Sequence, residues 1–378
     1  MRTLEELMAS HEGRSLLEMR GVATDEEAFV GSLRPPRLHE LSEHLGTPSG
    51  APIVYTAHQV MIDYPESVIA KFRAVQRVGG RPEVAAAVLW LDLDRAGADR
   101  MAVGTVVHGR GGGLQIRLAS RRHDHKEVRF VALEQAQVAQ TVRKIDAWAR
   151  QHTAAAGRAA RVAQVLLGGG SGTLGRTNLA LSSLLLHEQL GMTVPSALIS
   201  DLADRGILTQ AVNDVVDAVE DVVTVFNAAV GSLVAADVDP QVHYLPADYL
   251  PLHYSCDRDD RRCTLSRRRA GADTFAVTTC LCGATYRFHL GSRSMSIDEL
   301  AATGRWSTDV TLPLYLNNLA SGVVVGRSSA LYGMVLNEVL EKVLGWVPIP
   351  MLVPVDLPAV LARGAEGESL LQRYMVAP

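Results

Sequence analysis

The stretch Ala51-Pro-Ile-Val-Tyr-Thr-Ala-His-Gln59 decides the fold of this chain. Its apolar part, residues 51–57, is too short for a helix and is typical of a buried strand. A helix is predicted from Glu66 to Val78, where Gly79-Gly80 ends it. Its apolar face consists of Val68, Ile69, Phe72 and Val75.

A second apolar run, Ala86-Ala-Val-Leu-Trp-Leu91, follows this helix and leads into Asp92-Leu-Asp94. Strand, helix and strand within about 40 residues form the βαβ unit of a parallel sheet. The sequence therefore predicts an α/β protein with a Rossmann-like parallel core.

Polar residues follow both predicted strands, where ligands bind in such sheets. His58 is a candidate general base, and Gln59 a candidate substrate-binding residue. The acidic residues Asp92, Asp94 and Asp99 are candidates for binding an amine, a metal or a ribose. The alternatives are a packing role for His58 and a solvated loop for the acidic residues.

The length of the chain limits its domain organisation, and its net charge limits its partners. Its 378 residues suffice for two domains or for one large domain with an insertion. We expect a helical segment over 1–48, the core over 49–245, an insertion over 246–291 and the rest of the core over 292–378. The net charge of −4 gives no reason to expect nucleic acid or a membrane surface as a partner. The polar N-terminus and the lack of an apolar run of roughly 18 residues predict a cytoplasmic protein.

The cysteines are few and clustered. They are Cys256, Cys263, Cys280 and Cys282. Disulfide frameworks are typical of small secreted domains, so we expect metal binding instead. Four thiolates complete a tetrahedral zinc site and leave no open position, which predicts a structural zinc in a small ribbon-like element. Two alternatives remain: His253 replaces one cysteine in a catalytic site, or the cysteines are free and reduced.

A glycine-rich segment, Gly168-Gly-Gly-Ser-Gly-Thr173, follows the apolar run Val165–Leu167 and precedes a helix. Read as strand, turn and helix, it offers Ser171 and Thr173 to a phosphate or carboxylate. The spacing from Gly170 imitates a P-loop, but Arg176 stands in place of the lysine. A plain connection between two elements is the other interpretation.

A second anion-ready turn comes late in the chain, after the predicted strand Val323–Val325. Gly326-Arg-Ser-Ser329 precedes a helix predicted from Ala330 to Leu340. Ser328 and Ser329 are expected to cap that helix, and Arg327 to bind a carboxylate or phosphate. An ordinary capped helix start is the alternative.

Three segments together resemble the bacillithiol cysteine-adding enzyme family. They are Tyr55-Thr-Ala-His-Gln59, Leu89-Trp-Leu-Asp-Leu-Asp94, and the late pair Trp306–Leu314 and Gly326–Tyr332. The resemblance implies a Rossmann-like core related to class I aminoacyl-tRNA synthetases. It also implies joining of cysteine to an amine acceptor, with His58, Gln59, Asp94, Gly326, Arg327 and Ser328 lining the pocket.

The chain departs from that family in several places. Arg95 and Ala96 replace an aspartate and a histidine of its acidic stretch, and the cysteine-rich element is an addition. We therefore expect an acceptor different from that of bacillithiol synthesis. The favoured hypothesis is a ligase that joins an amino acid to a small amine, with ATP as a candidate co-substrate. In it, His58 or Asp94 takes the proton of the amine, and Arg327 holds a carboxylate or phosphate and stabilises developing negative charge. The alternatives are an amino-acid-adenylating enzyme and a zinc-stabilised binding protein without catalysis.

Overall fold

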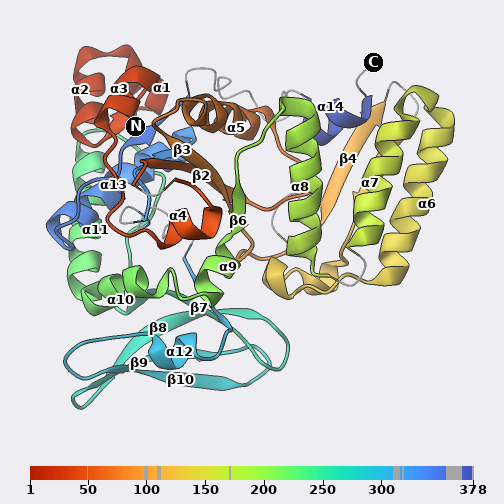
Figure 1. The fold of residues 1–378 in the computed structure, drawn as a ribbon. Helices are drawn as coiled ribbons and strands as arrows, with labels where there is room; N and C mark the ends of the chain where they lie inside the picture. The colour runs from red at the N-terminus through yellow and green to blue at the C-terminus, as the bar shows by residue number, and fades with distance from the viewer. Residues whose placement is uncertain are drawn as a thin grey trace.

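A computed structural model of the chain describes residues 1–48, 50–97, 101–108, 112–169, 172–309, 316, 319–354 and 368–376. Its centre is a six-stranded parallel sheet flanked by helices (Figure 1). In spatial order its strands are β1 (Val22–Ala23), β13 (Met351–Leu352), β12 (Gly322–Val324), β2 (Ile53–Gln59), β3 (Ala85–Leu91) and β6 (Ser196–Leu198). This arrangement is consistent with the predicted Rossmann-like core.

The predicted βαβ unit is confirmed. Strand β2, helix α5 (Glu66–Gly79) and strand β3 follow one another, and β2 pairs with β3 in parallel from Ile53↔Ala85 to Gln59↔Leu91. Strand β2 extends through His58 and Gln59, two residues beyond its apolar part. These two side chains therefore occupy the last positions of a central strand.

Alternating side chains of the sheet pack into two separate hydrophobic cores. Tyr55 and Leu89 face one core, with α13 (Arg327–Lys342) and α11 (Val219–Ala235), whereas Val54 and Val88 face the other, with α5. The period of two along each strand divides the residues in this way. Helices cover both faces of the sheet, as in doubly wound α/β proteins.

The N-terminal region is helical, as expected, but it is not wholly peripheral. Its helices are α1 (Leu4–Ala9), α2 (His11–Met19), α3 (Glu26–Ser32) and α4 (Glu40–Leu45). The short strand β1 between α2 and α3 pairs with β13 and forms one edge of the parallel sheet. The first 48 residues therefore complete the core.

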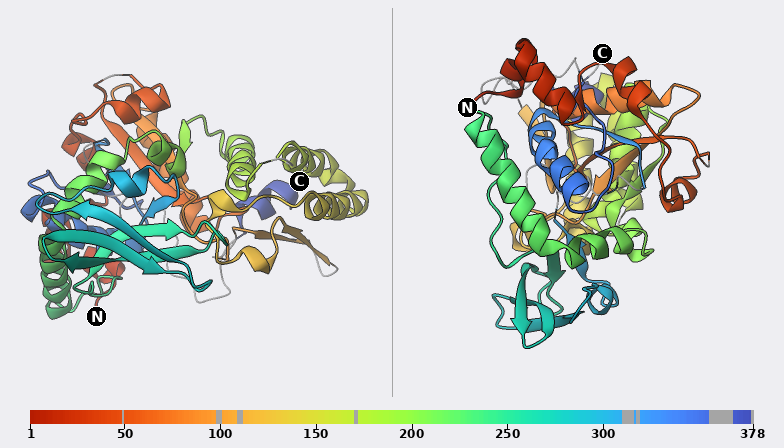
Figure 2. Two further views of the ribbon diagram at one scale, coloured as in Figure 1. Left: turned by 90° about the horizontal axis from the view of Figure 1, so that it is seen from below. Right: turned by 90° about the vertical axis from the view of Figure 1, so that its left-hand side faces the viewer.

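A helical layer and a hairpin lie between β3 and β6. They comprise β4 (Val103–His108), β5 (Gly112–Arg117), α6 (Gln135–Gln151), α7 (Ala156–Gly168) and α8 (Leu174–Leu190), with α14 (Leu370–Val376) packed beside them. Strands β4 and β5 pair in antiparallel fashion, from Val103↔Arg117 to His108↔Gly112. Seen from below, this group extends the molecule to one side (Figure 2).

The strand predicted at Val165–Leu167 is wrong, because these residues end helix α7. The buried positions of α7 are Ala159, Val162, Ala163 and Leu166, which recur at helical spacing. A short apolar run cannot by itself be distinguished from the buried stripe of a helix. The glycine-rich turn consequently joins two helices.

A second, antiparallel sheet lies against the lower edge of the main body in Figure 1. Its order is β10 (Thr285–Gly291), β9 (Asp273–Thr279), β8 (Arg262–Ala270), β7 (Tyr249–Ser255) and β11 (Trp306–Thr308). The short helix α12 (Asp298–Ala301) precedes β11. The cysteine-bearing element is therefore a five-stranded sheet that reaches beyond the predicted limit of residue 291; we call it the small sheet.

Three further helices, α9 (Ile199–Asp204), α10 (Thr209–Asp217) and α11, connect β6 to the small sheet. In the described part of the chain, no single helix is long and apolar enough to cross a membrane. Among the described helices, only α10 and α11 together meet such a test, and they are bent by 79° at their junction.

Candidate functional site

The order of the parallel strands reverses between β2 and β12. The chain passes from β2 through α5 to β3 on one side, and from β12 through α13 to β13 on the other. Open parallel sheets bind ligands at the carboxyl ends of the strands beside such a reversal. The carboxyl end of β2 is therefore the candidate ligand site.

Solvent reaches that end of β2, although β2 is a central strand. Residues 53–56 are fully buried, whereas Ala57, His58 and Gln59 are partly accessible. The strand end therefore opens toward the surface, with different groups on its two sides.

His58 lies on the side of β2 that faces α5. Its Nδ1 is 3.1 Å from the carbonyl oxygen of Gln59, and its ring meets the edge of Tyr64. Burial, together with the nearby ammonium of Lys71, lowers the pKa of His58 to about 3. The imidazole is therefore neutral at neutral pH and a weaker proton acceptor than the sequence suggested.

We expect His58 to make the protein sensitive to acid. Because its pKa is about 3 in the folded state and near 6.5 when unfolded, the unfolded state binds the proton first as the pH falls. The stability that His58 contributes is complete above pH 6.5 and is lost on the way to pH 3. Between pH 7 and pH 4 the wild-type protein should lose about 3 kcal/mol more unfolding free energy than the His58→Gln variant.

Urea titrations of both proteins at these two pH values measure that difference. Equal losses in wild type and variant would show that His58 titrates normally. The exposed His187→Gln substitution is a matched control and should behave as wild type.

Lys71 is a site residue that the sequence interpretation missed. It lies on α5, is 7% exposed, and donates a hydrogen bond from Nζ to the carbonyl of Ala57 at 3.3 Å. No carboxylate among the described residues pairs with it. Burial lowers the pKa of Lys71 to about 8. Its one sequence signal is a charged residue within the apolar run of residues 68–75.

The helix after β12 begins earlier than predicted. Helix α13 starts at Arg327, with Gly326 as its N-cap and no side chain capping it. The predicted capping by Ser328 and Ser329 is therefore wrong, because both lie inside the first turn. Gly326 lies beside Lys71, whose Cδ is 4.0 Å from the position that a Cβ would take.

Arg327 forms an ion pair with Glu5 of helix α1. The guanidinium thus ties the N-terminal region to the start of α13. Arg327 stays a candidate anion-binding residue, and any anion it bound would share it with Glu5.

Gln59 and Asp94 come together as predicted, toward the small sheet. Gln59 Nε2 lies 3.5 Å from Asp94 Oδ2, and Arg262 of strand β8 lies 3.6 Å from the same carboxylate. Asp92 has a different role: it is buried and accepts hydrogen bonds from the hydroxyl and backbone N–H of Ser200, at the start of α9. Asp99 lies outside the described residues.

No protein-family model matches this sequence, and no curated protein matches it either. What the site can do is therefore argued from its residues.

The glycine-rich turn offers little to an anion. Thr173 caps α8 by accepting a hydrogen bond from the backbone N–H of Arg176, and the N–H of Leu174 donates to the carbonyl of Val131. Two N–H groups of the first turn are thus already satisfied. Arg176, which stands at the lysine position of a P-loop, pairs with Asp201. Ser171 lies outside the described residues.

The cysteines gather at two hairpin tips of the small sheet. Cys256 and Cys263 flank the β7–β8 turn, whereas Cys280 and Cys282 lie in the β9–β10 turn. The thiols of Cys256, Cys280 and Cys282 and a carboxylate oxygen of Asp259 all lie within 4.8 Å of one another. Cys263 packs in the same buried group, where its thiol is 3.4 Å from the carbonyl of Arg261.

The distances between these donors fit a tetrahedral zinc ion. Zn–S bonds of about 2.3 Å place two sulfur ligands about 3.8 Å apart. The Cys256 and Cys282 sulfurs are 3.6 Å apart, and Cys280 Sγ lies 3.5 Å from Asp259 Oδ1. A hydrogen bond from the backbone N–H of Ala284 lowers the pKa of Cys282, which favours the thiolate that a metal binds. The group is compatible with a structural zinc, with Asp259 an additional candidate ligand.

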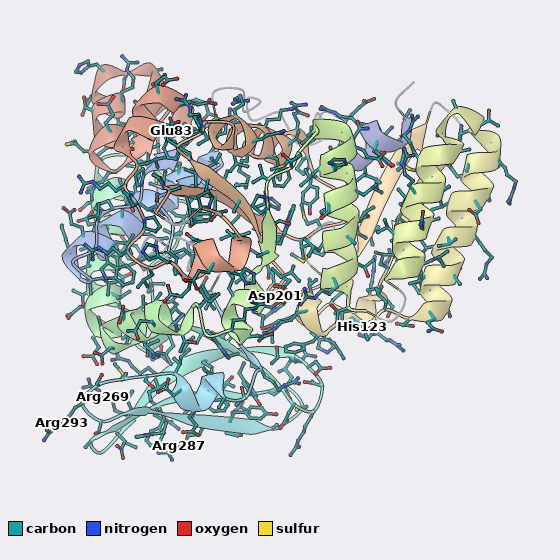
Figure 3. All side chains as sticks on the ribbon, viewed as in Figure 1. Glu83, His123, Asp201, Arg269, Arg287 and Arg293 are labelled. Atoms are coloured by element: carbon teal, nitrogen blue, oxygen red, sulfur yellow. The ribbon has the colours of Figure 1, made fainter. Side chains whose placement is uncertain are left out.

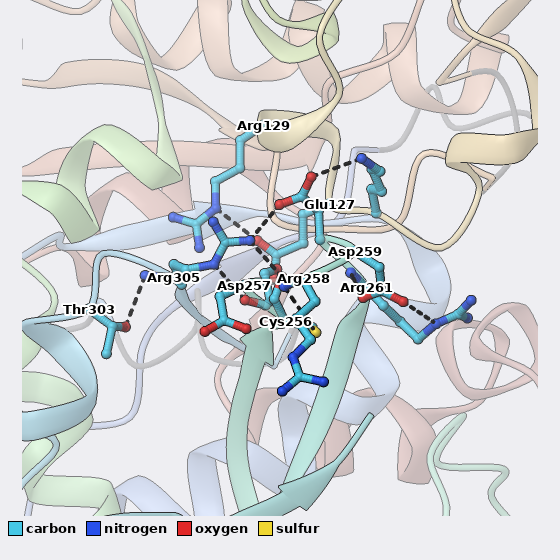
Figure 4. Close-up of polar contacts among 12 residues, drawn as sticks. Glu127, Arg129, Cys256, Asp257, Arg258, Asp259, Arg261, Thr303 and Arg305 are labelled. Atoms are coloured by element: carbon cyan, nitrogen blue, oxygen red, sulfur yellow. Dashed lines mark hydrogen bonds and ion pairs between the residues drawn. The ribbon is translucent and has the colours of Figure 1, made fainter. Parts of the chain in front are cut away.

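Polar contacts attach the β7–β8 tip to the main body (Figure 4). Arg305 donates to the carbonyls of Ser255 and Cys256 at 2.7 and 2.8 Å, and it also binds Asp260. Lys126 of the main body donates to Asp260 at 2.8 Å. A metal that orders this tip would therefore also order the surface next to Asp94.

The arginines of the small sheet do not form a single basic side. Arg267 and Arg269 pair with Glu220 of α11, whereas Arg262 faces the main body. Arg287 and Arg293 lie on the part of the small sheet farthest from the parallel sheet (Figure 3).

Two cavities in the described part of the chain lie away from the carboxyl end of β2. One of about 180 Å³ is lined by Arg34, Arg37 and the residues that precede β12 and β13. A neighbouring cavity of about 270 Å³ runs along the edge strand β1, from Gly21 to Asp25. Because open parallel sheets bind ligands beside the reversal of strand order, we do not assign the chemistry to these cavities.

Proposed function

We propose that this protein is a ligase that joins the carboxyl group of an amino acid to a small amine at the carboxyl end of β2. This proposal rests on the accessible end of a central strand, which has an amine-type base on one side and a carboxylate–guanidinium pair on the other. The base is Lys71, and the pair is Asp94 with Arg262. The resemblance to the cysteine-adding family supports an amino acid substrate, with cysteine as the first to test.

Lys71 is better suited than His58 to accept the proton of the attacking amine. With a pKa of about 8, an appreciable fraction of Lys71 is neutral near physiological pH, and a general base works best near the operating pH. In the proposed step the amine nitrogen attacks the activated carboxyl carbon and the new C–N bond forms. The leaving group departs with the electrons of its bond to that carbon, and the amine proton passes to Lys71 Nζ.

Activation of the carboxyl group needs an energy source, because joining a carboxylate to an amine with loss of water is unfavourable in aqueous solution. We propose a nucleoside triphosphate as co-substrate, with ATP as the form to test. The first turn of α13, which has no side-chain cap, offers backbone N–H groups for a phosphate or for the negative charge that develops at the carbonyl.

An assay with hydroxylamine as a general amine acceptor tests this function. The protein is incubated with each amino acid, ATP and magnesium, and the aminoacyl hydroxamate is detected by mass spectrometry. We expect product with one amino acid or a few related ones, at a rate that rises with pH to a plateau above about pH 8. Absence of hydroxamate with every amino acid would contradict the proposal.

A further inference from the structure

Arg262 is a largely enclosed arginine that the cysteine-bearing sheet directs toward the main body. It is the first residue of β8, and its side chain is 9% exposed. The neighbouring Cys263 packs in the cluster of cysteines at the hairpin tips. Side chains of successive strand residues point to opposite faces, so β8 places Cys263 in this cluster and Arg262 against the main body.

The hydrogen-bonding capacity of this guanidinium is largely unused. Its one hydrogen bond among the described residues goes from Nη2 to the carbonyl of Thr308 at 3.4 Å, and its Nε has none. The carboxylates of Asp94 and Glu127 lie 3.6 and 3.7 Å away. An arginine has five N–H donors, and leaving them unsatisfied in a buried place is unfavourable.

Glu127 meets this need only in part, because closer donors bind its carboxylate. It is fully buried, accepts from the hydroxyl of Ser307 at 2.5 Å, and accepts from Nε of Arg129 at 2.8 Å. Arg129 in turn donates to the carbonyl of Trp306. Glu127 therefore has close bonds with Ser307 and Arg129, whereas its contact with Arg262 is an ion pair at 3.7 Å (Figure 4 shows Glu127 and Arg129).

Asp94 is the loosely held counterpart of Arg262. Its carboxylate is 19% exposed, lies 3.5 Å from the amide of Gln59, and accepts the backbone N–H of Arg95 at 2.8 Å. Asp94 and Arg262 face each other without close hydrogen bonds, so a ligand could bind the negative carboxylate and the positive guanidinium at the same time. A zwitterion has the two complementary groups, an ammonium for Asp94 and a carboxylate for Arg262.

We propose that Arg262 binds the carboxylate, and Asp94 the ammonium, of an α-amino acid where the small sheet meets the parallel sheet. Naming an amino acid rests on the proposed function, whereas carboxylate binding by Arg262 rests on the geometry alone. The small sheet then belongs to the substrate site and is more than a stabilising addition.

Thermal unfolding of the full-length protein tests the inference with three sets of probes. These are the L-amino acids, their carboxamides, and 2-hydroxy acids that lack the amine. We expect an amino acid near 100 times its dissociation constant to raise Tm by a few degrees, and its carboxamide to give no shift. Arg262→Gln should weaken binding about 100-fold, and Arg262→Lys should restore it only in part.

Arg268→Gln is the matched control, because Arg268 is exposed on the same strand. Equal shifts with acid and carboxamide, or unchanged binding in Arg262→Gln, would overturn the inference, and the hydroxamate assay would then decide the ligase proposal separately. Hydroxy acids could also raise Tm as much as amino acids do, with both shifts lost in Arg262→Gln. That result would support carboxylate binding by Arg262 and overturn the choice of an amino acid as the ligand. No shift with any probe would overturn both. The wild-type comparison of acid with carboxamide decides the matter even if the variants fold poorly.

Discussion

Replacement of Lys71 by methionine should stabilise the folded protein by about 3 kcal/mol at pH 7 and reduce turnover by at least about 100-fold. Methionine keeps most of the volume of the lysine stem and removes a charge that burial disfavours. The pKa of Lys71 falls from 10.5 to about 8 on folding, so at neutral pH the buried ammonium lowers the free energy of unfolding. Urea unfolding and the hydroxamate assay measure the two effects.

The pH dependence of this effect has a definite sign. Because the unfolded lysine keeps its proton up to a higher pH, the wild-type protein gains stability as the pH rises from 8 to 10.5. The advantage of the Lys71→Met variant should therefore be largest below pH 8 and fall below about 1 kcal/mol at pH 10. Lys144→Met, an exposed substitution on α6, should leave stability and turnover unchanged. A Lys71→Met variant that is destabilised at pH 7, or as active as wild type, would contradict the assignment.

The second large effect is expected at the hairpin tips. Substitution of Cys280 by serine should lower the zinc content of the purified protein to well below one ion per chain. It should also destabilise the small sheet by several kcal/mol, because metal binding contributes directly to the stability of small metal-binding elements. Metal analysis by mass spectrometry and the unfolding transition report the two outcomes. Asp273→Asn, at the partly exposed β8–β9 turn of the same sheet, is the control.

The fourth zinc ligand is decided by two further variants. The distances favour Asp259 with Cys256, Cys280 and Cys282, so Asp259→Asn should weaken zinc binding more than Cys263→Ser. The reverse order would restore the four-cysteine site that the clustering of the cysteines predicted. Full stability and no zinc in wild type would reject the metal site altogether.

The sequence was most informative where local pattern and burial agree. The run of residues 51–59, the helix after it and the strand ending at Leu91 predicted the βαβ unit, because continuous apolar strands indicate a parallel sheet. The adjacency of Gln59 and Asp94 followed directly, since parallel strands bring their carboxyl ends to one edge.

Prediction failed where a linear pattern has two structural interpretations. Val165–Leu167 belongs to the end of a helix, because a short apolar run fits a strand and a helix stripe equally well. Lys71 was overlooked because burial of a lysine depends on tertiary packing. Arg262 is one of six arginines between residues 258 and 269, and only the docking of the small sheet on residues 125–129 places its side chain inside the protein.

A crystal structure of the full-length protein with the amino acid that stabilises it most would test the central claim directly. We expect the amino acid to lie at the carboxyl end of β2, with its carboxylate on Arg262 and its ammonium on Asp94. An amino acid bound instead in the cavity beside Arg34 and Arg37, at the opposite end of the sheet, would contradict it.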